Sequence, residues 1–237
     1  MNKISVIIPA LNEEKNIAKI IEHVKNSDIV NEIIIVDNNS TDKTREIVNK
    51  LGIKPLLCEK RGKGYAMEYG LKNATGDYIL FIDADICNYA TDFIDKMIAP
   101  LIEDDYDFVK AAFSREGGRV TELVAKPLLE LTFPKLTKFD QPLSGIIAGK
   151  KSLFEKIKFE KDYGVDIGIL IDCYQLKANI KEVNIGKITN DSQDWKDLTQ
   201  MARQVAKAIL KRSKKAFKDK LYSNKQKTWE HSHIFCF

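Results

Sequence analysis

The first 90 residues alternate short apolar runs with segments whose apolar residues recur at helical spacing. The apolar runs have the length of strands and each ends at a proline or a polar cluster: Ile4–Ile8, Ile33–Val36 and Tyr78–Ile82. The segments between them have helical spacing: Glu13–Lys25, Thr41–Leu51 and Tyr65–Asn73. Apolar strands alternating with helices are typical of βαβ units. The pattern therefore predicts an α/β fold with a mostly parallel central sheet.

The second half of the chain is less regular. Phe108–Phe113 and Ile180–Ile185 have the pattern of strands, and Thr121–Leu131 that of a helix interrupted near Pro127. Ile146–Ala148 and Ile167–Tyr174 are again apolar. Asp197–Lys215 predicts an amphipathic helix, with its apolar side formed by Leu198, Met201, Val205, Ala208 and Ile209. That apolar side is a candidate dimer surface, and the tail after Lys220 shows little pattern.

Polar clusters directly follow the first three predicted strands, at Pro9–Glu14, Asp37–Asp42 and Asp83–Asp85. In open α/β sheets, ligands bind outside the carboxyl ends of the strands. We therefore expect the three clusters to meet in one crevice.

Composition and charge limit the class of protein, its location and its partners. The chain has 237 residues, enough for one large core, and no apolar run reaches the roughly 18 residues of a transmembrane helix. The N-terminus does not have the pattern of a signal peptide, and the cysteines are scattered without a metal-binding spacing. We predict a cytoplasmic protein with no transmembrane segment and no nucleic-acid partner. Residues 207–227 carry nine Lys or Arg and one acid, which indicates a solvated helix face, or a surface for an anionic membrane or acidic partner.

The Asp83-Ala84-Asp85 cluster favours metal chemistry. Alternation along an extended chain places both carboxylates on one side, where their oxygens suit Mg²⁺ or Mn²⁺. A metal on a diphosphate neutralises the leaving group, so the site fits transfer from a nucleoside diphosphate sugar. A solvated turn rich in aspartate is the alternative for this cluster alone.

The loop Lys60–Gly64 opens the helix at Tyr65, and Lys63 with the helix N-terminus favours an anion. The loop does not match the patterns of P-loop ATPases or dinucleotide-binding dehydrogenases. Asp37 and Asn39 are candidates for contacts to a nucleobase or ribose, or for a simple turn.

Three segments together resemble the family 2 glycosyltransferases, which have the Rossmann-like GT-A fold: VIIPALNEE (6–14), IIVDNNSTDKT (34–44) and RGKGYAMEYGLKNATGDYILFIDAD (61–85). Four further segments resemble the glucosyl-3-phosphoglycerate synthases, with the mannosyl-3-phosphoglycerate synthases as near relatives: GGRVTELVAKPLLEL (117–131), QPLSG (141–145), YGVDIGILID (163–172) and MARQVAKAIL (201–210). The resemblance implies metal-assisted transfer of glucose, with retention, from UDP- or GDP-glucose to 3-phosphoglycerate. It also implies a GT-A domain over residues 1–190, with a nucleotide-sugar half (1–90) and an acceptor half (91–190). Residues 191–237 then form a helical, basic extension, and a homodimer is possible.

The resemblance also assigns roles to residues. The nucleotide sugar would contact Pro9, Ala10, Leu11, Asn12, Glu13, Asp37, Asn39, Lys63, Asp83 and Ala84. The acceptor's phosphate and carboxylate would lie on Gly118, Arg119, Val120 and Thr121. Asp85 would hold the metal and, with Asp166, would be catalytic.

The sequence departs from the family pattern at three positions. Ile146 stands where the family has an acid, and Asp166 replaces the usual Glu with a side chain shorter by one methylene. Asn190 occupies the place of a metal-binding His, and an amide oxygen can still ligate Mg²⁺. These departures leave open a nucleotide-sugar-binding protein with little catalysis. The basic C-terminal helix leaves open a transferase acting on polyprenyl phosphate at a membrane surface.

Overall fold

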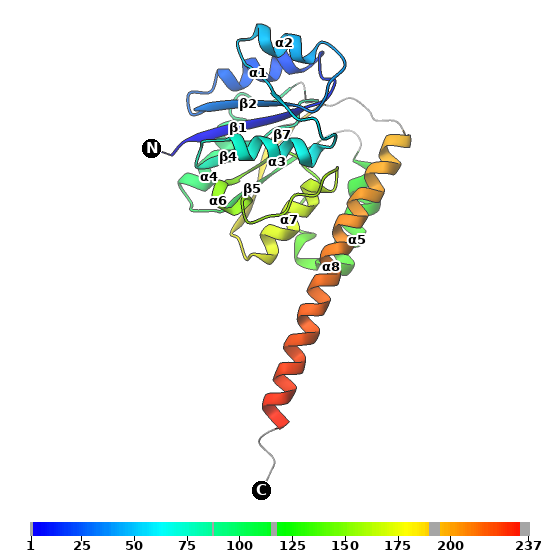
Figure 1. Cartoon of the computed structure of the whole chain (residues 1–237). Helices are drawn as coiled ribbons and strands as arrows, with labels where there is room; N and C mark the ends of the chain where they lie inside the picture. The colour runs from blue at the N-terminus through cyan, green and yellow to red at the C-terminus, as the bar shows by residue number, and fades with distance from the viewer. Residues whose placement is uncertain (1, 87, 115–117, 190–194, 233–237) are drawn as a thin grey trace.

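The computed structural model describes residues 2–86, 88–114, 118–189 and 195–232, with side chains through residue 214. Its strands form one sheet of seven, in the order β3-β2-β1-β4-β6-β5-β7 (Figure 1). The strands are β1 (Ile4–Ala10), β2 (Glu32–Asp37), β3 (Leu56–Leu57), β4 (Tyr78–Phe81), β5 (Phe108–Ser114), β6 (Ile147–Lys150) and β7 (Ile180–Lys187). Only β6 runs antiparallel to its neighbours, β4 and β5. The predicted α/β fold with a mostly parallel sheet is confirmed.

Helices cover both faces of the sheet, and each face has its own apolar core. One face is covered by α1 (Ile17–Lys25), α2 (Thr44–Lys50) and α4 (Phe93–Ile102). The other is covered by α3 (Lys63–Asn73), α5 (Lys126–Thr132), α7 (Val165–Gln175) and α8 (Trp195–Ser232). The short helices η1 (Thr121–Ala125), η2 (Pro134–Leu136) and α6 (Lys151–Phe154) connect these elements. Strands from residues 1–90 and 91–190 build one sheet, while the proposed boundary near residue 190 stays a prediction.

Local sequence explains most element boundaries. Helix α1 buries Ile17, Ile20, Ile21 and Val24, the spacing expected of an amphipathic helix. It begins four residues later than predicted, because Asn16 and Ile17 donate their N–H groups to the Glu13 carbonyl and close a turn first. Helix α4, whose Pro100 lies in its last turn, was not predicted from the sequence.

Pro127 does not end the helix that contains it. The five residues of η1 form a π-helical stretch, in which Lys126 N–H donates to the carbonyl of Thr121. Because proline lacks an N–H and its ring crowds the preceding turn, a wider turn before Pro127 lets the helix continue into α5. The predicted interruption is thus a change of helical pitch.

Helix α8 extends far beyond the predicted Asp197–Lys215 and reaches Ser232. Its first half packs against α7 and α5 (Figure 1). Val205, Ala208 and Ile209 are at most 2% exposed there, so the face suggested as a dimer surface is buried within the chain itself. That suggestion was wrong, because the domain's own apolar face on α7 and α5 is the nearer partner for this helix.

A cluster of ion pairs fixes α8 to α7. The guanidinium of Arg212 donates from Nε and Nη2 to the two carboxylate oxygens of Asp172, at 2.8 and 2.7 Å. Its Nη1 donates to Glu160 at 2.7 Å, and Lys211 pairs with the same carboxylate. Gly168 on α7 lies so close that a Cβ there would meet the guanidinium at 2.9 Å.

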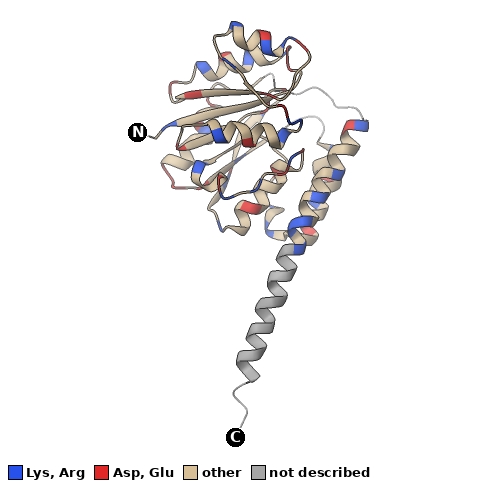
Figure 2. Ribbon diagram, viewed as in Figure 1, with Lys and Arg blue, Asp and Glu red and all other residues tan. Residues whose placement is uncertain are grey.

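Charged residues occur mainly in the helices and loops, and the central strands carry few of them (Figure 2). Among the described residues, no helix is both long enough and apolar enough to cross a membrane. In the basic stretch at 207–227, the side chains from residue 215 onward lie outside the described part of the structure.

Candidate active site

The carboxyl ends of β1, β2 and β4 meet at one edge of the sheet. Ala10 is paired with Asp37 in the parallel register, and Ile7 with Phe81, so the segment after β4 lies beside Pro9 and Ala10. Ala84 is buried there, and Asp83 and Asp85 are half-buried. The expected convergence of the three polar clusters is what the strand register produces.

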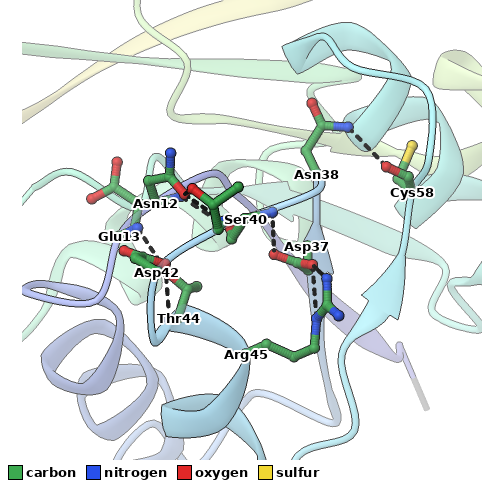
Figure 3. A network of polar contacts seen from close by, with 10 residues as sticks. Asn12, Glu13, Asp37, Asn38, Ser40, Asp42, Thr44, Arg45 and Cys58 are labelled. Atoms are coloured by element: carbon green, nitrogen blue, oxygen red, sulfur yellow. Dashed lines mark hydrogen bonds and ion pairs between the residues drawn. The ribbon is translucent and has the colours of Figure 1, made fainter.

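Hydrogen bonds join the loop after β1 to the loop after β2 (Figure 3). The backbone N–H of Asn12 donates to Ser40 Oγ at 3.0 Å, and the side-chain Oδ1 of Asn12 accepts the backbone N–H of Thr41 at 2.8 Å. The Glu13 N–H donates to Thr44 Oγ1 at 2.8 Å. Asn12 itself has a positive φ of 58°, a conformation that asparagine tolerates. The Pro9–Glu13 segment is therefore held in one conformation.

Asp37 has a structural partner within the site. It is 1% exposed, its Oδ2 accepts two hydrogen bonds from Arg45, and its Oδ1 accepts the N–H of Ser40 (Figure 3). Asn39 is exposed, with φ at 69°. The carboxylate of Asp37 therefore shapes the turn, and Asn39 projects from that turn.

Asn38, between them, is a residue that sequence reasoning missed. Its amide group donates to the carbonyls of Cys58 and Lys60, and its Oδ1 accepts the Gly62 N–H at 2.7 Å. It thereby ties the end of β2 to the basic loop before α3. From the sequence alone, nothing in the Asn38-Asn39 pair indicates which of the two side chains is buried.

The basic loop is held by close backbone packing. A Cβ on Gly62 would lie 2.2 Å from the carbonyl oxygen of Lys161, and one on Gly64 would lie 1.6 Å from that of Glu160. Gly62 also has φ at 143°, which a side chain would strain. The two glycines allow α3 to begin directly at Lys63, against the segment that leads into α7.

Lys63 lies between two carboxylates. Its Nζ is 2.7 Å from Asp83 Oδ1 and 2.9 Å from Asp166 Oδ2. The Lys63 and Asp83 side chains are 19% and 25% exposed, whereas Asp166 is only 3% exposed. Lys63 starts α3, Asp83 follows β4, and Asp166 lies in the first turn of α7. We call these three residues the charge cluster.

The pKa values of Lys63 and Asp166 are shifted by burial and by their neighbours in the cluster. Burial lowers the pKa of Lys63, but Asp166 and Asp83 together raise it far above that of a free lysine. Burial raises the pKa of Asp166; Lys63 lowers it and Asp83 raises it again, and the net direction is upward. Two carboxylates share one ammonium, so Asp166, the more buried of the two, is the one whose ionised form is costly. Its second oxygen, Oδ1, has no hydrogen-bond partner among the described residues.

Gly145 closes the cluster from the opposite side. A Cβ at this position would lie 2.3 Å from Lys63 Nζ and 2.4 Å from Asp83 Oδ1. Only glycine leaves room for this ion pair. The sequence pattern at 141–145 does not by itself predict a role for this residue.

A second group of binding candidates lies at the start of η1. Gly118 has φ at 83°, and its carbonyl accepts the N–H of Glu122, which leaves the N–H groups of residues 119–121 at an open helix N-terminus. Val120 and Thr121 are buried, and Thr121 Oγ1 has no partner among the described residues. Arg119 is exposed, with its guanidinium 5.0 Å from the ring centroid of Trp195.

The donors present fit a hydrated divalent cation better than a cage of protein ligands. No group of three or more His, Cys, Asp or Glu side chains gathers in the described part of the chain. Mg²⁺ commonly takes one or two carboxylates and completes its shell with water and phosphate oxygens. Asp85, half-buried at the edge of the sheet, meets that requirement. Asn190, the other predicted ligand, lies outside the described residues.

Comparisons with known proteins agree with this geometry. The model of glycosyl transferase family 2 matches residues 5–162. Glucosyl-3-phosphoglycerate synthase from Mycolicibacterium smegmatis is 34% identical over 88% of this chain and 77% of its own length. The enzyme of the same name from Petrotoga mobilis is 34% identical, over 90% of this chain and 74% of its own length. The chain belongs to glycosyl transferase family 2, in the glucosyl-3-phosphoglycerate synthase group.

Solved structures give the same relationship. The Mycobacterium tuberculosis glucosyl-3-phosphoglycerate synthase, in complex with Mn²⁺, UDP-glucose and phosphoglyceric acid, superposes with a TM-score of 0.85 at 36% identity. That match covers 90% of this chain and 80% of the other. A structure of the same enzyme with Mg²⁺ and UDP also has a TM-score of 0.85. The GT-A fold of this family 2 glycosyltransferase is thereby established.

The departure at Ile146 has a structural explanation in this glycosyltransferase. Ile146 is fully buried in the core on the α1 and α4 face of the sheet. An isoleucine there stabilises the core by burial.

Gly145→Ala tests how tightly the cluster is packed. The added methyl group displaces Lys63 or Asp83, so we expect kcat/KM for glucosyl transfer to fall about 10- to 100-fold, as for other misplaced catalytic groups. Gly52→Ala is the control: Gly52 has φ at 76° in open space, so alanine there lowers stability but leaves kcat/KM unchanged. Steady-state kinetics and thermal melting separate the two effects, and an unchanged kcat/KM in Gly145→Ala would contradict the packing argument.

Proposed function

We propose that this chain transfers glucose from UDP-glucose to 3-phosphoglycerate, with Mg²⁺ or Mn²⁺ as cofactor and with retention at the anomeric carbon. The observation that carries the proposal is the charge cluster at the carboxyl edge of the sheet, in the same domain as the helix N-terminus at Gly118–Thr121. The solved relatives carry UDP-glucose and phosphoglyceric acid together. UDP rather than GDP is proposed because UDP is the nucleotide in those complexes.

The donor half of the site is proposed to use the loops joined in Figure 3. Pro9–Glu13 and Asn39 frame the nucleoside, while Asp37 keeps their loops in place through Arg45. Lys63 binds the diphosphate or the sugar, since its ammonium has three donors and uses two of them on carboxylates. Asp83, with Ala84 beside it, contacts the ribose or the glucose.

The acceptor half is proposed to use the start of η1. The N–H groups of residues 119–121 at the helix N-terminus favour an anion, and Arg119 offers a guanidinium fork for a phosphate or carboxylate. Among the described residues, the buried Thr121 Oγ1 has no hydrogen-bond partner, which is costly unless a bound ligand satisfies it. 3-Phosphoglycerate carries both kinds of anionic group and a single free hydroxyl to accept the sugar.

The reaction breaks the bond between the anomeric carbon and the diphosphate and forms one to the oxygen of the acceptor hydroxyl, and UDP and the hydroxyl proton are released. Asp85 and Asn190 are proposed to hold the metal, which, when bound, neutralises charge on the departing UDP. Asp166 is proposed to accept a hydrogen bond from the sugar or the acceptor hydroxyl through Oδ1, which has no partner in the part of the chain that the structure describes. Its side chain is held in place for this role by Lys63.

The other candidate functions have less support. A dolichyl-phosphate-linked transferase from Methanococcus voltae is 43% identical, but over only 94 residues and 35% of this chain. The similarity to the glucosyl-3-phosphoglycerate synthases includes the acceptor half as well. We propose a cytoplasmic location, since Cys58 and Cys173 are free and buried, as suits a reducing compartment.

A coupled assay of UDP release tests the proposed reaction. With Mg²⁺ and UDP-glucose we expect release that depends on 3-phosphoglycerate, stops with EDTA and returns with excess Mg²⁺ or Mn²⁺. Asp85→Ala should lower kcat at least about 100-fold, as loss of an electrostatic group at the leaving group does. Asp104→Ala, an exposed carboxylate away from the site, is the control and should keep full activity. Release that is indifferent to 3-phosphoglycerate would overturn the proposal and favour lipid phosphates or simple binding.

We also propose a homodimer, formed through exposed leucines beside α8. Leu123 and Leu131 are 72% and 79% exposed on η1 and α5, the two highest exposures among the large apolar side chains of the described residues. Light scattering should give twice the 27.0 kDa chain mass, and the double variant Leu123→Asp with Leu131→Asp should give a monomer. Leu57→Asp, at the edge strand β3, is the control that should stay dimeric, and a monomeric wild-type chain would contradict the proposal.

A further inference from the structure

A fully buried lysine lies beneath the charge cluster, and the assigned site residues do not include it. Lys110 is the third residue of β5 and is 0% exposed. Its cross-strand neighbour Ile147 belongs to the apolar core on the α3 and α7 face of the sheet. Lys110 therefore enters that core from below the site. Burying an ammonium group among apolar side chains costs free energy unless opposite charges and hydrogen bonds compensate it.

One hydrogen bond of Lys110 reaches the turn that carries Gly145. Its Nζ donates to the carbonyl oxygen of Ser144 at 2.8 Å. The same turn is anchored at its start, where the Glu182 carboxylate accepts the N–H groups of Asp140 and Gln141. Because Gly145 packs against Lys63 and Asp83, a shift of the Ser144 carbonyl moves the wall of the charge cluster.

The charge of Lys110 also acts on Asp166. The groups that face Asp166 are Lys63 from α3, Asp83 after β4 and Lys110 from β5. Lys63 is shared with Asp83, so Lys110 is the second cation available to a carboxylate that is 2% exposed. The groups around Lys110 itself are Asp166, Lys63, Glu182 from β7 and Cys173 from α7. Burial lowers the pKa of Lys110 to about 8, which still leaves it mostly charged at neutral pH.

We propose that Lys110 is a positioning residue of the transferase: it fixes the Ser144–Gly145 peptide against the Lys63–Asp83 ion pair and keeps Asp166 ionised. This inference rests on the proposed function, because it assigns Asp166 as a hydrogen-bond acceptor in glucosyl transfer. Lys110 itself touches no substrate, and it acts only through Gly145 and Asp166.

Lys110→Met tests the proposal by removing the charge while keeping an unbranched chain of similar volume. Without the neighbouring cation the pKa of Asp166 rises, so a higher pH is needed to ionise it. We expect the acidic limb of the kcat profile to move up by roughly one pH unit, the size of shift that a nearby charge produces. At a pH on that limb, kcat then falls about tenfold, while KM for UDP-glucose changes little because Lys63 remains.

Two comparisons separate positioning from folding. Lys181→Met removes a surface lysine of β7 that pairs with Asp104, and should leave melting temperature, kcat and the pH limb unchanged. In Lys110→Met, a lower melting temperature with an unmoved pH limb would show a purely structural role and overturn the proposal.

A stability measurement tests the same claim without any activity. Between the pKa of an unfolded aspartate, about 3.9, and the raised pKa of folded Asp166, stability falls as pH rises because the folded state holds the proton more tightly. The difference in unfolding free energy between wild type and Asp166→Asn stops changing at the folded pKa. In the Lys110→Met background this difference should level off at a higher pH, and levelling at the same pH would overturn the proposal. If the wild-type chain transfers no glucose, the proposed function fails, while this comparison still decides the role of Lys110.

Discussion

The site depends on one shared cation. Lys63 lies between Asp83 and Asp166 at 2.7 and 2.9 Å, and these three side chains come from α3, the end of β4 and α7. Two carboxylates in a largely buried place repel each other, and a single ammonium group offsets that repulsion only if it touches both. The position of α3 relative to α7 is therefore an electrostatic requirement as well as a packing one.

Several local features follow from that requirement. Gly62 and Gly64 let the start of α3 approach the backbone at residues 160–161, and Gly145 leaves space on the other side of the ion pair. The Glu160 carboxylate accepts a hydrogen bond from Arg212. The same segment that supports Lys63 therefore also holds α8 in place. The C-terminal helix is in this way part of the support of the active site, although its far half extends beyond the domain (Figure 1).

The sequence predicted the sheet and the edge at which its polar strand ends meet, because apolar strands and their polar ends are local patterns. It also predicted Lys63, Asp83 and Asp166 as site residues, but not that one lysine joins the two carboxylates, since 103 residues separate Lys63 from Asp166. Asn38, Lys110 and Gly145 were missed for the same reason: their roles come from partners far along the chain. The amphipathic face of α8 was visible in the sequence, yet a pattern of this kind cannot tell an internal partner from a second copy. Helix α4 was missed, although its apolar residues follow helical spacing, and Pro100 lies within it.

The central claim is that Lys63 and Asp166 act as one unit. A double-mutant cycle tests it: kcat/KM for UDP-glucose is measured for wild type, Lys63→Met, Asp166→Asn and the double variant. Residues in one ion-pair network typically show coupling of about 0.5–3 kcal/mol, so the double variant should lose little more than the worse single variant. Losses that simply multiply would show two independent residues and contradict the account.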